Sequence, residues 1–332
     1  MQLDLLDAFR SLDEPMPGDP GFPLFTTHPI AELEGVLIGK SSGGGACLLV
    51  SAAPDDTSRP PYDLDLLRVD WNRPVKYIHG GHQTENRFTI IRCKGNDLEQ
   101  IELFLYIFVS LLSRLEQPFK SQSVMESVNR CIQLFQRSQL PSSKSVLGVW
   151  SELLLICLSG DPNFFARAWH SSANEKYDFA FGSSLIEVKC TTGPTRSHHF
   201  SAAQLIPPSG AKCWVASFRT SILTNGTTVK DLVKEATNRE GISLENAERI
   251  LDITISALGK DWASGRAQSF DRKEAVASLK FFRSQDVPSV GTVPAGVSAV
   301  QFTSELEFAN PAPDDDFLDP LLSQLCGRQH GH

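Results

Sequence analysis

The stretch from Tyr177 to Lys189 reads YDFAFGSSLIEVK and decides the fold of the region around it. Two short apolar segments flank a Gly-Ser pair, which is the pattern of a β-hairpin with a two-residue turn. In such a hairpin Asp178 lies opposite Glu187, and directly opposed residues project to the same face with Cβ atoms about 5 Å apart. Lys189, two residues further along, points to that face as well. The pattern therefore predicts two carboxylates and an ammonium group at one place on an apolar sheet.

Charged groups in apolar strands need partners, because burying an isolated charge is costly. Two carboxylates beside a lysine can hold a hard divalent cation and a water molecule that the cation activates. The alternative interpretation is structural: Glu187 and Lys189 form an ion pair on one face, and Asp178 caps the end of its strand. A competing run, DRK at 271–273, has no apolar flanks and is typical of a solvated surface.

The hairpin resembles the motif of the PD-(D/E)XK nuclease superfamily, the restriction-endonuclease-like fold, over roughly residues 146–220. The chain as a whole is similar, more weakly, to the bacterial family of PD-(D/E)XK motif proteins. Tyr177 stands where a proline usually precedes the first aspartate. The resemblance implies that Asp178 and Glu187 are metal ligands and that Lys189 positions or activates the attacking water. It also implies a catalytic acidic residue on the preceding helix, a position that Glu152 fills.

The expected cofactor is Mg²⁺, with Mn²⁺ able to substitute. Asp178, Glu187 and Glu152 offer carboxylate oxygens, and Val188 can add its carbonyl oxygen. Incomplete cages that retain water suit Mg²⁺ better than an all-protein site. The activity that the resemblance implies is metal-dependent hydrolysis of the phosphodiester bonds of DNA by an endonuclease.

Polar residues after the hairpin are candidates for contact with the DNA substrate. Arg196, His198 and His199 precede or begin an expected helix, and arginine and polar groups at a helix N-terminus bind phosphate. Gln204, about one and a half turns further on, is placed to hydrogen-bond the residues of the active site. A solvated loop and a surface glutamine are the alternative interpretations.

The expected fold class is α/β, with a restriction-endonuclease-like core of order α-β-β-β-α-β and a mixed sheet between helices. The core elements are a helix at 146–158, strands at 164–169, 178–181 and 184–189, a helix at 199–205 and a strand at 212–219. The domains are an N-terminal α/β module at 1–117, the nuclease-like core at 118–222, a C-terminal α/β region at 223–310 with strands near 275–282 and 297–306, and a flexible acidic tail at 311–332.

Composition limits the possible partners and compartments. The 332 residues carry a formal net charge of −8, which argues against tight binding to DNA by the chain alone, since lysine and arginine supply most non-specific affinity. Seven cysteines without a CxxC pair suggest neither a zinc site nor a disulfide framework. No run is apolar and long enough for a membrane span, and the first residues lack the basic start of a signal peptide, so we expect a cytoplasmic protein.

The acidic charge favours a subunit that depends on partners for its targeting. The resemblance implies a bacterial restriction or anti-phage defence system in which ATPase- or helicase-like proteins accompany the nuclease. A homodimer is also expected, because cutting both strands commonly uses two active sites. The alternatives are a catalytically silent DNA-binding or scaffold subunit that keeps this fold, and an unrelated interaction protein with a fortuitous hairpin.

Overall fold

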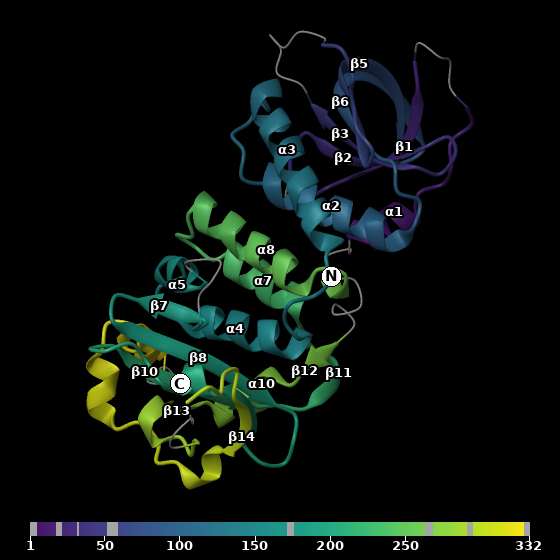
Figure 1. Cartoon of the computed structure of the whole chain (residues 1–332). Helices are drawn as coiled ribbons and strands as arrows, with labels where there is room; N and C mark the ends of the chain where they lie inside the picture. The colour runs from purple at the N-terminus through teal and green to yellow at the C-terminus, as the bar shows by residue number, and fades with distance from the viewer. Residues whose placement is uncertain are drawn as a thin grey trace. The chain divides into compact units, whose positions relative to one another are not determined.

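The computed structural model of the protein describes residues 5–17, 22–31, 33–51, 59–170, 176–262, 268–290 and 295–328. The chain forms two compact units, residues 1–137 and 138–332, each built from helices and strands (Figure 1). The division falls later than the boundary expected at 117, and residues 223–310 share a unit with the hairpin. Within the described ranges, no helix combines the length and the apolar character that crossing a membrane requires.

The first unit is a six-stranded sheet that closes on itself. Its strands are β1 (Leu24–Pro29), β2 (Val36–Ser41), β3 (Ala46–Ser51), β4 (Tyr62–Asp63), β5 (Leu67–His79) and β6 (His82–Cys93). They lie in the order β1-β2-β3-β6-β5-β4, and β1 also pairs in parallel with β5. Three helices belong to this unit, namely α1 (Leu5–Arg10), α2 (Leu98–Leu112) and α3 (Ser121–Ser138). Asp97 caps the first turn of α2, because its side chain accepts a hydrogen bond from the Gln100 backbone N–H at 2.7 Å.

The second unit is organised around a four-stranded sheet of order β13-β10-β8-β7. Its strands are β7 (Phe179–Phe181), β8 (Ser184–Thr191), β10 (Lys212–Arg219) and β13 (Lys280–Arg283). Strands β7 and β8 are antiparallel, β8 and β10 parallel, and β10 and β13 antiparallel, so the sheet is mixed as expected. Two short two-stranded sheets accompany it, one of β9 (Ser197–Ser201) with β14 (Gln301–Glu305) and one of β11 (Ile222–Thr228) with β12 (Ser269–Phe270).

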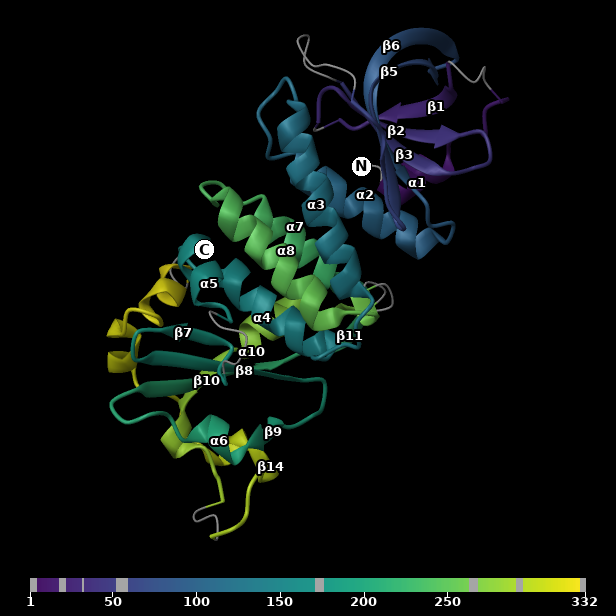
Figure 2. The ribbon, with the colours of Figure 1, turned by 45° about the horizontal axis from the view of Figure 1, so that its top comes forward.

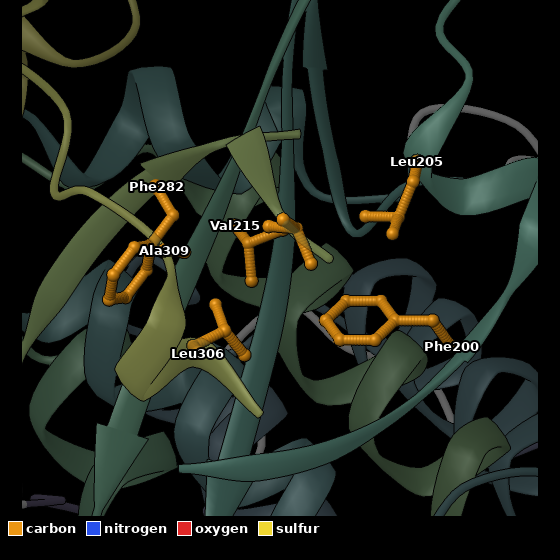
Figure 3. Packing of buried hydrophobic residues seen from close by; sticks show 7 residues of the cluster. Phe200, Leu205, Val215, Phe282, Leu306 and Ala309 are labelled. Atoms are coloured by element: carbon orange, nitrogen blue, oxygen red, sulfur yellow. The ribbon is translucent and has the colours of Figure 1, made fainter. Parts of the chain in front are cut away.

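Helices cover one face of this sheet. The helix α4 (Val146–Leu158) packs on β8, and α7 (Val229–Thr237) and α8 (Leu244–Leu258) stack above it. Figure 2 shows β9, β14 and the short helix α6 (Ala202–Leu205) on the opposite side of the sheet. There a buried cluster gathers around Val215 of β10 (Figure 3), made of Phe200, Leu205, Val215, Phe282, Val287, Leu306 and Ala309.

The strand expected at 164–169 is wrong, because these residues form the helix α5 (Pro162–Ala168). Asp161 caps its first turn by accepting from the Phe164 backbone N–H at 3.0 Å, and proline at the first helical position fits the fixed backbone angle of a helix start. Phe165 then packs on Phe179 of β7, with ring centroids 5.3 Å apart. The core order therefore has a second helix where the sequence analysis places a strand.

Two further elements differ from the sequence prediction. The expected helix at 199–205 is helical only over α6, because residues 197–201 pair with β14, with Phe200 opposite Phe302. The expected strand near 275–282 begins instead as the helix α10 (Arg272–Ser278), capped by Asp271, which accepts from the Glu274 backbone N–H at 3.0 Å. Only its last part becomes strand β13.

The acidic tail is also not a free end over its described residues. It contains the 3₁₀ turns η3 (Asp314–Leu318) and η4 (Ser323–Arg328). The buried Asp316 carboxylate accepts from Trp214 at 2.8 Å and forms a two-pronged pair with Arg283 at 2.7 Å. Asp319 accepts from the Ser184 hydroxyl at 2.8 Å. Residues 311–328 are therefore fixed to the sheet of the second unit, and 329–332 lie outside the described residues.

Candidate functional site

The hairpin forms as the sequence predicts. Phe181 pairs with Ser184 across the turn, and Gly182 adopts a φ of 58°, which glycine reaches without a steric penalty. Continuing this register past the end of β7 brings Asp178 opposite Glu187. Strand β7 begins only at Phe179, so the Asp178 side chain is free to turn toward α4.

Asp178 is buried and each of its oxygens has a separate partner. Oδ2 accepts a hydrogen bond from the Val188 backbone N–H at 2.7 Å, which replaces the missing strand partner beyond β7. Oδ1 lies 2.6 Å from Nζ of Lys144. Burial and the charge of Glu152 raise the pKa of Asp178, while Lys144 opposes that rise. Asp178, just before the first residue of β7, is thus held by the Val188 backbone N–H and faces the Lys144 ammonium group.

Glu152 lies on α4, as expected, and is also buried. Its Oε2 accepts from Nε1 of Trp169 at 2.7 Å and lies 2.9 Å from Nε2 of His170. Its Oε1 lies 2.6 Å from Nζ of Lys144. Burial acts to raise the pKa of Glu152, but His170 and Lys144 outweigh it and the pKa is lowered. Glu152 is therefore an anion whose two oxygens are held in fixed directions.

Lys144 joins the two carboxylates and is a residue that the sequence analysis missed. Its ammonium group contacts Glu152 and Asp178 and lies 2.9 Å from Nε2 of His170. Burial acts to lower the pKa of Lys144, but the two carboxylates raise it above its ordinary value, so the group is charged. Lys144 directly precedes Ser145, the N-cap of α4. Nothing in a lone lysine before a helix indicates such a contact.

His170 is the second residue that the sequence analysis missed. Its φ of 40° lies in the left-handed region, which is strained for a residue with a side chain. Arg249 of α8 holds it there, because its Nη2 donates to the carbonyl oxygens of Trp169 at 2.6 Å and of His170 at 2.5 Å. The His170 backbone N–H donates to the Asp178 carbonyl at 3.0 Å. The place of His170 beside Glu152 depends on the helix α5 that precedes it. Because the sequence pattern predicts a strand there, it does not indicate this contact.

Glu187 and Lys189 lie on one face of β8, as the strand period predicts. Oε1 of Glu187 is 2.7 Å from Nζ of Lys189 and also accepts from Nε2 of Gln204. Oε2 is buried and has no hydrogen-bond partner. Burial, followed by the charge of Asp178, raises the pKa of Glu187 to about 8. Without a bound cation, this carboxyl group therefore takes up a proton more readily than an ordinary glutamate does.

These groups fit a divalent metal ion. Ligand atoms of Glu152, His170 and Asp178 lie within 4.8 Å of one another, and they are the one such trio of His, Cys, Asp or Glu in the described chain. The Lys144 ammonium shows that a cation is accommodated between the two carboxylates. Glu187 lies outside this trio, although its unpartnered Oε2 is a further oxygen donor close enough to Asp178 to feel its charge. Val188 contributes its N–H to Asp178, and a carbonyl contact with metal stays a prediction.

The structure buries two of the four residues that are expected to contact the substrate. The Arg196 guanidinium donates to the Ser217 carbonyl at 2.8 Å, to the Ser217 hydroxyl at 3.0 Å and to the Ser278 carbonyl, so its donors serve the fold. His198 is 4% exposed, with Nε2 2.8 Å from the Ser217 hydroxyl, and burial lowers its pKa to about 4.

The other two residues keep a possible role. His199 is exposed, and its Nδ1 lies 2.9 Å from the Thr303 hydroxyl of β14. Gln204 contacts Glu187, as expected of a residue that supports the active site, and its Oε1 accepts from the Ser201 backbone N–H at 2.9 Å. That second bond closes the first turn of α6 and fixes the amide group against Glu187.

Residues 8–307 match the model of a protein family described as "Putative PD-(D/E)XK family member, (DUF4420)". The chain belongs to this family. Membership agrees with the resemblance carried by the hairpin, and it extends that resemblance over both compact units. No curated protein and no solved structure matches the chain at a significant level. Asp178, Glu187 and Lys189, with Glu152 on the preceding helix, stay the predicted motif residues of this member.

Proposed function

We propose that this PD-(D/E)XK family member is a metal-dependent endonuclease that hydrolyses phosphodiester bonds of DNA. The observation that carries the proposal is that Glu152 and Asp178 converge on one cationic group, Nζ of Lys144, which lies 2.6 Å from each carboxylate. The hairpin that carries Glu187 and Lys189 lies beside them. Charged groups are buried at this depth when they are paired or bind metal. If all three carboxyl groups ionise, they carry more negative charge than Lys144 and Lys189 neutralise.

The ligands suit Mg²⁺ and favour Mn²⁺. Carboxylate oxygens and retained water are the usual environment of Mg²⁺. The imidazole nitrogen of His170 adds a ligand that transition metals accept more readily than Mg²⁺ does. We therefore expect Mn²⁺ to bind more tightly at Glu152, Asp178 and His170, with Mg²⁺ sufficient at cellular concentrations.

Each side chain has a role in this proposal. Glu152 and Asp178 hold the ion, and Glu187 supplies a further oxygen once its proton leaves. A bound divalent ion supplies charge neutralisation at the scissile phosphate and an acidified water. Lys189, held by Glu187 and lying 5.0 Å from the ring centroid of Phe200, orients that water or stabilises the charge that develops on phosphorus.

The setting that we propose is a bacterial restriction or anti-phage defence system. The net charge of −8 makes tight binding to DNA by the chain alone unfavourable. Partners such as ATPase- or helicase-like proteins would deliver the DNA, and a homodimer would place two centres on the two strands. Sequence and methylation preference would then come from the partners or from regions outside the centre.

A catalytically silent scaffold subunit is the second candidate. The observation that favours it is the Lys144 network, which already satisfies Glu152 and Asp178 without metal. A retired nuclease could keep this ion pair for stability alone. Binding of DNA without cleavage, in the presence of Mn²⁺, would favour this candidate over the first.

A plasmid-nicking assay with Mg²⁺ or Mn²⁺ tests the leading proposal. We expect Asp178→Asn, which removes a metal ligand, and Lys189→Met, which removes a positioned catalytic group, each to slow cleavage by about 100-fold or more. Lys273→Met is the matched control, because it removes an exposed lysine from the competing Asp-x-Lys run, where Asp271 only caps α10. Its rate should stay within about twofold of the wild-type rate. Undiminished cleavage by both site variants would contradict the assignment.

A further inference from the structure

We infer that the ammonium group of Lys144 stands at the position of the divalent cation, and that a metal ion enters the centre by displacing it. The inference rests on the proposed function, since it concerns the same centre. Nζ of Lys144 lies 2.6 Å from Oε1 of Glu152, 2.6 Å from Oδ1 of Asp178 and 2.9 Å from Nε2 of His170. These are the same three side chains whose ligand atoms form the candidate metal site.

The carboxylates are oriented toward this point by other groups. Oε2 of Glu152 is held by Trp169, and Oδ2 of Asp178 is held by the Val188 backbone N–H. In each carboxylate one oxygen is thus fixed by the fold, and the other is left for the shared cation. Removing the ammonium group therefore leaves a pair of aligned oxygens, which is the arrangement that a divalent ion requires.

Metal and ammonium exclude each other from this position. Both are cations that need the same two oxygens, and like charges at contact distance repel strongly in a buried site. The Lys144 side chain is 29% exposed, whereas those of Glu152 and Asp178 are 4% and 9% exposed. The lysine can therefore move into solvent on its flexible stem, while the carboxylates stay in place. The ammonium group leaves still protonated, so its hydrogen bonds to Glu152 and Asp178 are exchanged for metal–oxygen bonds and no proton is transferred.

The displaced Lys144 side chain can then bind the substrate. Its backbone remains next to the N-cap of α4, so the released ammonium group stays within one side-chain length of the centre. There it can pair with a phosphate oxygen of the substrate, as lysine does at many phosphate sites. Lys144 thus couples metal occupancy to the positive charge presented to the substrate.

Calorimetric titration of the full chain with Mn²⁺ provides the first test. We expect Lys144→Gln to bind Mn²⁺ at least about tenfold more tightly than the wild type, because the competing cation is gone. Lys260→Gln, which removes an exposed lysine of the same compact unit, should leave the affinity within about twofold. Equal or weaker binding by Lys144→Gln, with wild-type binding intact, overturns this inference and leaves the nuclease proposal standing. No Mn²⁺ binding by either protein overturns both.

Chemical labelling of the unaltered protein provides a second test that does not depend on a variant folding. Lysine acetylation, followed residue by residue by mass spectrometry, should be slow at Lys144 without metal and at least about fivefold faster with saturating Mn²⁺. The exposed Lys260 should react at the same rate in both conditions. A Lys144 rate that Mn²⁺ leaves unchanged or lowers overturns the inference.

Discussion

Two lysine side chains form ion pairs with the three carboxyl groups of the site. Lys144 joins Glu152 and Asp178, while Lys189 pairs with Glu187, and all three acidic side chains are buried. Breaking a buried ion pair by removing one partner generally costs several kcal/mol, because it leaves an uncompensated charge. Substitutions in this group therefore require a stability measurement beside every measurement of activity.

His198 gives a pH dependence that can be isolated. Burial, and next the charges of Lys189 and Arg196, lower its pKa from 6.5 to about 4 in the folded protein. Between these values the unfolded chain binds more protons than the folded chain, so the free energy of unfolding falls as the pH falls. Between pH 7.5 and 5 the loss due to His198 is roughly 2 kcal/mol.

Denaturant unfolding at the two pH values measures this contribution. His198→Gln can keep a hydrogen bond to Ser217 but cannot titrate, so its stability should fall less on acidification than that of the wild type. His199→Gln removes the neighbouring exposed histidine and should follow the wild type. The same pH dependence in all three proteins would show that His198 does not supply the effect.

Some residues of the site could be predicted and others could not. Asp178, Glu187 and Lys189 follow from a hairpin whose register is set locally by a two-residue turn. Lys144 and His170 come from a loop and from the end of α5, and only tertiary packing brings them to the carboxylates. The chemistry of Arg196 and His198 predicts contact with the substrate, but in the structure both side chains are buried and contact Ser217 of β10.

The hairpin and the short helix α5 before it position the side chains of the site. Strand β7 has three residues and begins after Asp178, so the Val188 N–H pairs with the Asp178 side chain and not with a strand partner. Helix α5 brings Trp169 and His170 against Glu152. Helix α8 contributes Arg249, which holds the strained backbone of His170. Three separate elements thus position the ligands around α4.

The turn of the hairpin is the element for which a stability change can be predicted. Gly182 has a φ of 58°, and a Cβ atom there would meet nothing within 4 Å, so any cost of substitution is conformational. We expect Gly182→Ala to lower the free energy of unfolding by roughly 1 kcal/mol and Gly182→Asn by less, since asparagine tolerates this region better. Urea unfolding of both variants measures the difference. An alanine variant as stable as the wild type would contradict the turn geometry.

Element prediction succeeded where local signals dominate. Helix α4 lies where expected and has a clear cap at Ser145, and α7 and α8 are likewise capped, at Thr228 and Ser243. Residues 164–169 and 275–278 have apolar patterns that suit either structure, and the capping aspartates before them decided for helix. Residues 197–201 became strand β9 through pairing with β14, about a hundred residues away, which no local pattern reveals.

The whole molecule consists of two compact units, and the centre lies entirely in the second. Residues 223–310 complete that unit through α7, α8 and β13, and the acidic segment after them is anchored by Asp316. The family model spans both units, so the closed sheet of residues 1–137 is part of what defines the family. We propose that this first unit serves recognition of DNA or of partners, while the second performs the chemistry.

Anomalous diffraction from crystals grown with Mn²⁺ tests the central claim most directly. The account predicts a manganese peak coordinated by Glu152 Oε1, Asp178 Oδ1 and His170 Nε2, with the Lys144 side chain turned away toward solvent. A contradictory result would be a fully ordered Lys144 still bridging the two carboxylates at saturating Mn²⁺, with no manganese beside them.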